Sequence, residues 1–306
     1  MTTAILCPGQ GAQRVGMGTE WAARSAAARE VFRRASDAIG LDLLALCAGG
    51  PQERLVRTDV CQPAILAVSC AALAGLEEEG RFRPSEAVAA LGLSLGEYTA
   101  LSVAGVLGLE DAVRLVRLRG EAMQAASDSV PSGMMSLLGA DPEAAERVCA
   151  EATREGGVCV VANLNAPGQV VISGDDAALA RAEKAAAAAG LRRAIRLDVA
   201  GAFHSPLMEP ARRKLEEAIR AAKFLPARIP VYSNATAEPS RDPGLLRANL
   251  VRQLTAPVLF EASVRRAQQE GVVRFFELSP GRVLTGLVKK IDRATLVEAC
   301  EGGAGA

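Results

Sequence analysis

One serine stands between glycines at a spacing that suits a nucleophile. Ser94 lies in Gly92-Leu93-Ser94-Leu95-Gly96, a G-x-S-x-G pattern that follows an apolar run and precedes a helix-forming one. A tight turn from strand to helix needs small residues two places before and after the serine, so that strand and helix can approach. The hydroxyl then lies at a helix N-terminus, which favours developing negative charge. The pattern predicts Ser94 as the nucleophile of acyl transfer; the alternative is a structural serine in a glycine-rich turn.

A serine hydroxyl is a weak nucleophile until a base takes its proton. His204 is the only histidine of the chain, and we expect it on a loop between a strand and a helix, where catalytic residues are common. A lone histidine is more often a satisfied core or surface residue, but no other imidazole competes for the role. We therefore predict His204 as the base. With one histidine and irregularly spaced cysteines, no zinc ligand set is formed, and we expect no metal site.

Composition narrows the remaining classes of function. Half of the 306 residues are hydrophobic, and 35 basic residues balance 35 acidic ones. A neutral chain without a dense basic run, and with only 3% aromatic residues, gives no reason to expect a nucleic-acid partner. The longest apolar run, Val60 to Leu76, is interrupted by Gln62 and Pro63, so we expect no membrane span.

The cysteines and the N-terminal residues indicate a compartment. Seven cysteines occur at irregular spacing with no C-x-x-C pair, and we interpret them as reduced and mostly buried. Ala4 to Cys7 indicates a buried strand rather than a secretory signal. We expect a cytoplasmic protein; the alternative is the plastid stroma or mitochondrial matrix, if a transit peptide has been removed.

Short apolar segments alternate with longer helix-forming ones, which is typical of α/β proteins. Over the two outer parts of the chain, the predicted strands are Ala4–Cys7, Ala87–Gly92, Ile229–Ser233 and Val272–Leu278. The predicted helices are Glu20–Ala38, Cys61–Glu79, Glu97–Ala104, Leu109–Ser127, Pro206–Ala222, Leu245–Gln253, Phe260–Glu270 and Val283–Ile291.

The middle of the chain forms a second pattern. Its predicted elements are the strand Met134–Leu138, the helix Asp141–Arg154, the strands Cys159–Leu164 and Gln169–Ser173, the helix Asp175–Ala189 and the strand Arg193–Val199. The order βαββαβ is that of a ferredoxin-like unit. We predict a large α/β-hydrolase-like domain from residues 1–128 and 201–300, an inserted small ferredoxin-like subdomain from residues 129–200, and a tail, 301–306, whose last residues, Gly302 to Ala306, we expect to be disordered.

Six short motifs occur in order along nearly the whole chain, from Ile5 to about Ile291. They are Pro8-Gly9-Gln10-Gly11-Ala12-Gln13, Gly92-Leu93-Ser94-Leu95-Gly96-Glu97, Arg119-Gly120-Glu121-Ala122-Met123-Gln124, Asn165-Ala166-Pro167-Gly168-Gln169, Phe203-His204 and Arg252-Gln253-Leu254. Together they resemble malonyl-CoA:acyl carrier protein transacylases and the acyltransferase domains of polyketide synthases.

The resemblance implies a role for each matching residue. Ser94 would carry the acyl group, with His204 as its base, and Arg119 would bind the free malonyl carboxylate. Arginine suits this task because its planar fork makes two parallel charge-assisted bonds to a carboxylate. Without the resemblance, Arg119 is one more exposed charge on the Leu109–Ser127 helix.

The resemblance also implies an oxyanion hole made by the backbone N–H groups of Gln10 and Leu95. It replaces the acidic third member of a triad by the backbone carbonyl of Gln253, which orients the histidine. A dinucleotide or phosphate loop at Gly9 to Gly18 is a weak alternative, because no G-K-[ST] and no properly spaced G-x-G-x-x-G is present.

Three further residues are expected close to the substrate: Leu93, Phe203 and Asn165. Leu93 departs from the family, which usually has histidine before the nucleophile, so we assign that position no role in carboxylate binding or extender choice. Phe203 resembles the malonyl-selective pattern, in which bulk excludes a 2-methyl group; one methyl is worth only about 1–3 kcal/mol.

The implied function is ping-pong transfer of malonyl from malonyl-CoA to the phosphopantetheine thiol of acyl carrier protein, for fatty-acid or polyketide synthesis. The CoA and phosphopantetheine thioesters are substrates, and no cofactor is expected. We expect a monomer, and the basic runs Arg212-Arg213-Lys214 or Lys289-Lys290 would steer its acidic carrier protein; the alternative is that these runs are solvated helix faces. The alternatives are a serine hydrolase or thioesterase with the same elbow, and a non-catalytic carrier-protein docking module.

Overall fold

The computed structural model describes residues 2–300. Its strands are β1 (Thr3–Cys7), β2 (Ala87–Gly92), β3 (Ser132–Leu138), β4 (Cys159–Ala166), β5 (Gln169–Asp175), β6 (Arg193–Arg196), β7 (Val231–Tyr232), β8 (Pro239–Ser240), β9 (Arg274–Glu277) and β10 (Leu296–Ala299). Its helices are α1 (Thr19–Arg24), α2 (Ala26–Ile39), α3 (Leu43–Gly49), α4 (Gln52–Leu55), α5 (Thr58–Glu78), α6 (Gly96–Val103), α7 (Leu109–Ser129), α8 (Pro142–Ala152), α9 (Asp176–Ala188), α10 (Glu209–Ala221), α11 (Pro243–Gln253), α12 (Phe260–Gln269) and α13 (Val283–Ile291), with two 3₁₀ turns, η1 (Pro84–Glu86) and η2 (Pro206–Met208).

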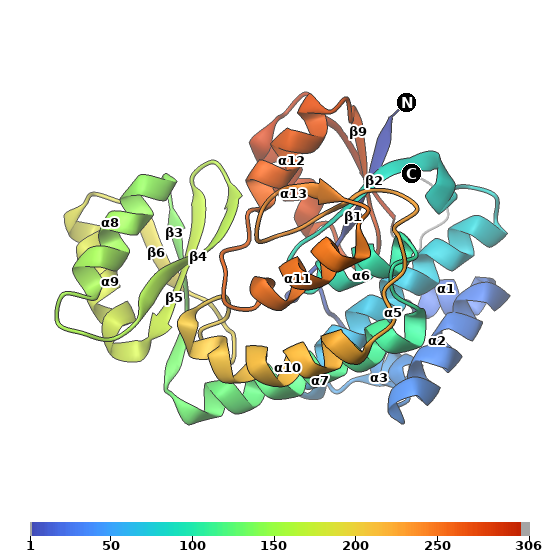
Figure 1. Cartoon of the computed structure of the whole chain (residues 1–306), viewed down its shortest axis with the longest axis horizontal. Helices are drawn as coiled ribbons and strands as arrows, with labels where there is room; N and C mark the ends of the chain where they lie inside the picture. Colours follow the sequence, from blue (N-terminus) through green and yellow to red (C-terminus); the bar gives the residue numbers. More distant parts are fainter. Residues whose placement is uncertain (1, 301–306) are drawn as a thin grey trace.

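The larger sheet is mixed and mostly parallel. Its strand order is β10-β9-β1-β2-β7-β8, and only β8 runs antiparallel to its neighbour. Alternate residues of β1 enter two different cores: Ile5 and Cys7 pack with the helices α2, α5 and α7, whereas Ala4 and Leu6 pack with α12 and α13. Helices therefore cover both faces of this sheet (Figure 1), which explains why its central strands are apolar on both sides.

A buried helix runs through the larger core. α5 has 21 residues, and by length and composition alone it could cross a membrane, but 89% of its most apolar window is buried inside the fold. α7 crosses it closely at Gly120, where an added Cβ would lie 2.5 Å from the Thr58 carbonyl oxygen and 2.6 Å from the Asp59 Cα. Only glycine allows the two helices to meet this closely, directly beside Arg119.

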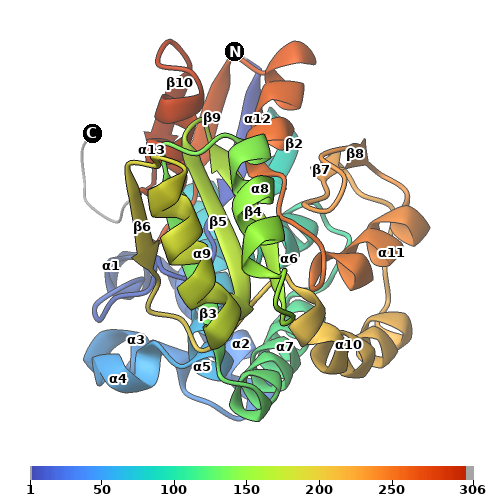
Figure 2. The same ribbon diagram turned by 90° about the vertical axis from the view of Figure 1, so that its left-hand side faces the viewer.

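The smaller sheet is antiparallel, with the order β4-β5-β3-β6. α8 and α9 lie side by side on one face of it (Figure 2) over their own apolar core. The opposite face contributes Met134, Ala162 and Val171 to the larger core. β4 is also tied to the segment before α12, because the Val258 N–H donates to the Ala162 carbonyl at 2.8 Å and the Leu164 N–H to the Val258 carbonyl at 2.9 Å.

Most predicted elements are present, with three kinds of correction. The single helix predicted over Glu20–Ala38 is wrong: Ser25 has an extended backbone and its hydroxyl caps α2 by accepting from the Ala28 N–H. The helix predicted over Pro206–Ala222 begins as the turn η2, and the last strand of the middle segment ends at Arg196 rather than Val199. The short α3, α4, β8 and the edge strand β10 were not predicted, and the tail 301–306 lies outside the described residues.

Candidate active site

The strand β2 turns into α6 at Ser94, which has a positive φ of 53°. A Cβ on Gly92 would collide with the Gly96 carbonyl group, and one on Gly96 would collide with the Cys7 carbonyl oxygen. These contacts explain the glycines of the pattern, because strand and helix touch through their backbones. A non-glycine residue held in the left-handed region costs about 1–3 kcal/mol, and such strain is common where a reactive group must be presented.

Ser94 and His204 lie in contact although they are far apart in sequence. The Ser94 Oγ is 2.7 Å from the His204 Nε2, and the His204 Nδ1 is 3.0 Å from the Gln253 backbone oxygen. A carbonyl can only accept, so Nδ1 carries the ring hydrogen and Nε2 presents its lone pair to the serine hydroxyl. His204 also has a positive φ, 57°. The arrangement places a base where it can take the serine proton.

The environment of His204 keeps its ring neutral. The side chain is buried, and burial together with the neighbouring Arg119 charge lowers the pKa of His204 to about 4, although hydrogen bonds to the backbone at Gln253 and Ala256 oppose the shift. A neutral imidazole at physiological pH is the form that can accept a proton.

Arg119 is buried, with 1% of its surface exposed, which corrects the exposed position that the pattern of α7 alone suggests. Its Nη1 donates to the Gln62 Oε1 at 2.8 Å, and its Nη2 donates to the Ser94 Oγ at 3.0 Å and to the Gln253 Oε1 at 3.3 Å. The ring of Tyr98 lies below it, 5.6 Å from the guanidinium carbon. Within residues 2–300, no carboxylate forms an ion pair with Arg119. Burial lowers the pKa of Arg119, but an arginine stays charged.

Gln10 and Leu95 are the two predicted oxyanion donors. Gln10 lies at the wall of the cavity, and Leu95 is the residue before α6. In the described part of the chain, neither backbone N–H is hydrogen-bonded to another protein group. Gly9 lies against the Leu93 backbone, where an added Cβ would collide with the Leu93 carbonyl oxygen, so the loop carrying Gln10 is held at the elbow.

A cavity of about 460 Å³ opens at the dyad. Leu93, Phe203 and Asn165 line it, as expected from the sequence, and so do Asn163, Met123, Met134 and Leu197. The Asn165 Oδ1 is buried and has no hydrogen-bond partner among residues 2–300. The volume suits a small acyl group with part of a longer arm.

Sequence reasoning missed a layer of polar groups behind the dyad. Gln62 holds Arg119, and the Asn234 Oδ1 accepts from the Ser94 N–H at 2.7 Å while its Nδ2 donates to the Gly92 carbonyl at 2.6 Å. The Gln253 side chain, not only its carbonyl, takes part, and Glu97 is fully buried beside it. Glu97 stands inside the elbow motif, and Asn234 is the second residue after β7, which pairs with β2; these positions were the available signals.

The sequence analysis predicted that the chain has no metal site. Across residues 2–300, no three His, Cys, Asp or Glu side chains gather as a possible metal site. Six cysteines are buried and Cys70 is half-buried. The two ring nitrogens of His204 contact the Ser94 Oγ and the Gln253 backbone oxygen.

Comparison with known proteins agrees with this geometry. Residues 5–301 match the acyl transferase domain family. The chain is 42% identical over 290 residues to the malonyl CoA-acyl carrier protein transacylase of Bacillus subtilis, covering 95% of this chain and 90% of the relative. It is 41% identical over 288 residues to that of Escherichia coli strain K12, covering 94% and 92%.

Solved structures give the same answer. The malonyl CoA-acyl carrier protein transacylase from Coxiella burnetii superposes with a TM-score of 0.94 at 35% identity, over 98% of this chain and 94% of that one. A malonyl-transacylase solved with its type II PKS acyl-carrier protein superposes with a TM-score of 0.92 at 39% identity, over 98% and 96%. With a serine–histidine pair at the elbow and a match over nearly its whole length, the chain belongs to the acyl transferase domain family.

Proposed function

We propose that this enzyme transfers the malonyl group of malonyl-CoA to the phosphopantetheine thiol of an acyl carrier protein through a malonyl-Ser94 intermediate. The observation that carries the proposal is the buried Arg119, which touches the nucleophile and, within residues 2–300, has only neutral hydrogen-bond partners. A buried cation with no carboxylate in direct contact is costly, and an anionic group of the substrate would relieve that cost. The relatives' names point to the same reaction.

In the first half-reaction, the Ser94 Oγ attacks the thioester carbonyl as the His204 Nε2 takes its proton. The carbon–sulfur bond breaks, and His204 returns the proton to the CoA sulfur. The N–H groups of Gln10 and Leu95 hold the oxyanion, which would gain most of its stabilisation there. In the second half-reaction, the carrier thiol gives its proton to His204 and its sulfur attacks the carbonyl of malonyl-Ser94. The ester bond to the Ser94 Oγ breaks, and His204 returns the proton to that oxygen, so the enzyme is regenerated and no cofactor takes part.

Arg119 binds the free carboxylate in this scheme. Its plane is fixed by Gln62 on one side and Gln253 on the other, so its fork needs little reorganisation to hold a carboxylate. The Ser–His pair alone would fit a serine hydrolase equally well, and Arg119 is the feature that favours malonyl transfer. Phe203 and Leu93 form the apolar wall, where Phe203 disfavours a 2-methyl branch.

The carrier protein would meet the basic residues of α13 rather than those of α10. Arg212 and Arg213 are paired with Glu209 and Glu216, which neutralise that face. Lys289 donates to the backbone oxygens of Arg293 and Thr295, and Lys290 to the Gln169 amide oxygen. These neutral partners leave the α13 charges available to an acidic surface. The enzyme would act as a cytoplasmic monomer and supply fatty-acid or polyketide synthesis.

The domain organisation belongs to the same proposal. Residues 1–128 and 201–300 form a large α/β-hydrolase-like domain, supported by the mostly parallel sheet with helices on both faces. Residues 129–200 form a ferredoxin-like subdomain, supported by the order β4-β5-β3-β6 and by α8 and α9 on one face. The cavity lies between residues of both parts, so each would supply one wall.

Intact mass spectrometry tests the proposal. Incubation with malonyl-CoA should add one malonyl mass to the protein, methylmalonyl-CoA and acetyl-CoA should add much less, and Ser94→Ala should abolish every gain. Addition of an acyl carrier protein should then move the malonyl mass to the carrier. Release of free malonate without transfer would favour the hydrolase, and an unmodified protein would favour a docking module.

A further inference from the structure

A buried carboxyl group behind the dyad has no part in the mechanism above. Glu97 is fully buried on α6, three residues after the nucleophile. Its Oε2 accepts from the Gln253 Nε2 at 2.8 Å and from the Asn234 N–H at 3.1 Å. Its Oε1 has no hydrogen-bond partner in the described part of the chain. A buried acid satisfied on one oxygen only is costly, so a role for it is expected.

Both partners of Glu97 hold the nucleophile. The Gln253 Nε2 also donates to the Ser94 carbonyl at 2.8 Å, and the backbone oxygen of the same residue contacts His204. Asn234 accepts from the Ser94 N–H. Glu97 thus fixes the two residues that keep the strained Ser94 and His204 in place, without touching either side chain of the dyad.

The Gln253 amide also joins Glu97 to Arg119. Its oxygen accepts from the Arg119 Nη2, and its nitrogen donates to the Glu97 Oε2. The amide dipole is therefore aligned between a cation and a carboxylate. Arg119 lacks a direct ion pair within residues 2–300, and Glu97 is the carboxylate connected to it through one amide.

We propose that Glu97 positions the dyad and serves as the counter-charge of Arg119, so that binding of the malonyl carboxylate is coupled to uptake of a proton by Glu97. The coupling rests on the proposed function. The substrate carboxylate places a second negative charge on Arg119, which disfavours the ionised form of Glu97. Malonyl binding should then strengthen relative to acetyl binding as the pH falls.

The groups that face Glu97 agree with this coupling. Burial raises the pKa of Glu97 to about 7, opposed by hydrogen bonds from Gln253 and Asn234 and by the Arg119 charge. Tyr98 on α6 and Cys61 on α5 would interact electrostatically with Arg119 if they were ionised. Burial raises the pKa of both side chains, so they stay neutral. His204 is neutral as well. A proton can therefore move on or off Glu97 near neutral pH.

Calorimetry tests the coupling with protein that cannot turn over. Malonyl-CoA and acetyl-CoA are bound to Ser94→Ala in two buffers of different ionisation enthalpy at pH 7. The difference between the two ligands should show uptake of a fraction of a proton, because their CoA parts are identical. In Ser94→Ala/Glu97→Gln that difference should vanish. An unchanged difference would overturn the coupling.

Two variants separate charge from position. Glu97→Gln keeps an oxygen for both donors and should retain loading of Ser94 while losing the pH dependence of malonyl affinity. Glu97→Ala releases Gln253 and Asn234 and should lower kcat by about tenfold or more for malonyl and acetyl alike, through misplacement of the dyad. Equal kcat in Glu97→Ala and the parent would remove the positioning role.

Two controls separate a general loss of stability from loss of the proposed coupling. Glu277→Gln removes another buried carboxylate, one that accepts from the N–H groups of Leu284 and Thr285 away from the dyad, and should leave the proton difference unchanged. If Glu97→Gln does not fold, difference infrared spectra of Ser94→Ala decide: malonyl-CoA should raise the band of a protonated buried acid, and no rise would refute the coupling. A mass gain on Ser94 in the parent shows whether the proposed function holds in either case.

Discussion

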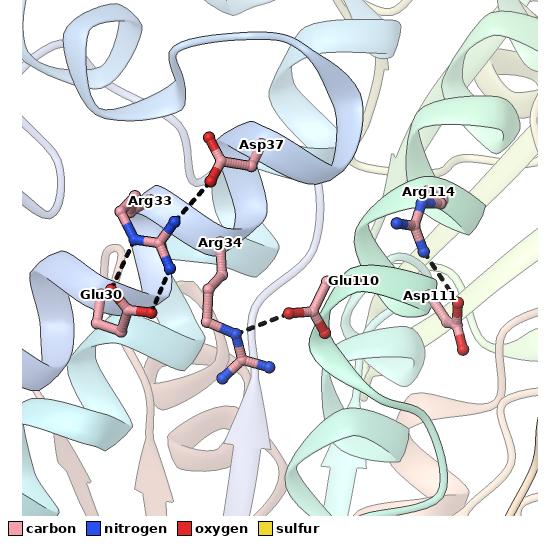
Figure 3. Close-up of polar contacts among 7 residues, drawn as sticks. All are labelled: Glu30, Arg33, Arg34, Asp37, Glu110, Asp111 and Arg114. Carbon is pink, nitrogen blue, oxygen red and sulfur yellow. Dashed lines mark hydrogen bonds and ion pairs between the residues drawn. The ribbon is translucent and has the colours of Figure 1, made fainter.

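Where α2 and α7 meet at the surface, Arg33, Arg34 and Arg114 each contact a carboxylate. Arg119 of the same α7 is buried and, within residues 2–300, has only neutral hydrogen-bond partners. Arg33 lies 2.6 Å from Glu30 and 2.7 Å from Asp37, and Arg34 lies 2.7 Å from Glu110 (Figure 3). Arg114 contacts Asp111 in the same cluster. These pairs are exposed and water screens them.

The difference separates charges that are paired at the surface from a charge that the proposed function assigns to the substrate carboxylate. An exposed arginine is cheap and pairs with whatever acid its helix neighbours offer. A buried arginine without a carboxylate would be selected against unless something else uses its charge. The polar groups around Arg119 orient its fork but leave its charge uncompensated by direct contact. The following predictions test this contrast.

The largest effect is expected from His204→Ala. General-base catalysis contributes about 10²–10⁴-fold, so loading of Ser94 from malonyl-CoA should fall by that factor. Rapid-quench measurement of the acyl-enzyme gives the rate. A loss of less than tenfold would mean that another group takes the Ser94 proton.

Arg119→Ala should be nearly as damaging, but only for the acidic substrate. Truncating one partner of a buried charge pair costs about 2–5 kcal/mol, or ~30- to 5,000-fold in kcat/KM for malonyl-CoA. Acetyl transfer should fall less, because it loses the contacts of Arg119 with Ser94, Gln62 and Gln253 but no bond to a substrate carboxylate. Arg34→Ala is the matched surface control and should leave both rates unchanged. Equal losses for malonyl and acetyl would contradict a carboxylate clamp.

The pH dependence of Ser94 loading distinguishes a buried His204 from a solvent-exposed histidine. Since the pKa of His204 is lowered to about 4, its base form persists in mild acid. Loading at saturating malonyl-CoA should change little between pH 7 and pH 5. A midpoint near 6.5 would show that the ring is not desolvated.

The same shift affects stability. The unfolded chain protonates this histidine near pH 6.5, whereas the folded protein resists protonation down to about pH 4. Folding stability should therefore fall as the pH drops through this window, by about 3 kcal/mol from this group. Urea unfolding of the parent and of His204→Gln at several pH values measures the difference.

The smallest effect belongs to the surface. Removing the Arg34–Glu110 pair should cost about 0.2–1 kcal/mol of unfolding free energy, and less at high salt. A double-mutant cycle with Arg34→Met and Glu110→Gln isolates the pair. A coupling energy of several kcal/mol would show that this cluster is not the solvated surface that the comparison assumes.

The sequence was sufficient for the local parts of the site and insufficient for its second layer. The Gly92-Leu93-Ser94-Leu95-Gly96 turn is encoded within a few residues, because glycines must stand where backbones touch. Glu97, Asn234 and the Gln253 amide meet only through contacts over long distances in sequence. Nothing in the helical pattern of α7 distinguishes the buried Arg119 from the exposed Arg114.

The secondary structure was likewise predictable where the local sequence encodes it, and not where it depends on distant partners. The predicted bounds of long periodic helices such as α7 and of buried strands such as β2 agree closely with the structure, because the spacing of apolar residues dictates these elements. The break at Ser25 depends on one hydroxyl that caps a helix, and β10 forms only because β9 offers it an edge. Such features follow from partners that the local pattern does not contain.

Gly120 allows the neighbouring Arg119 side chain to extend as far as Ser94. The side chain next to it can extend to the serine hydroxyl only while α7 lies directly against the first turn of α5, and one methyl group at residue 120 would act as a wedge between the two helices. The guanidinium would then be withdrawn from its target with every catalytic group still present. Under the proposed function, the missing side chain of Gly120 therefore sets the distance between Arg119 and the acyl group on Ser94.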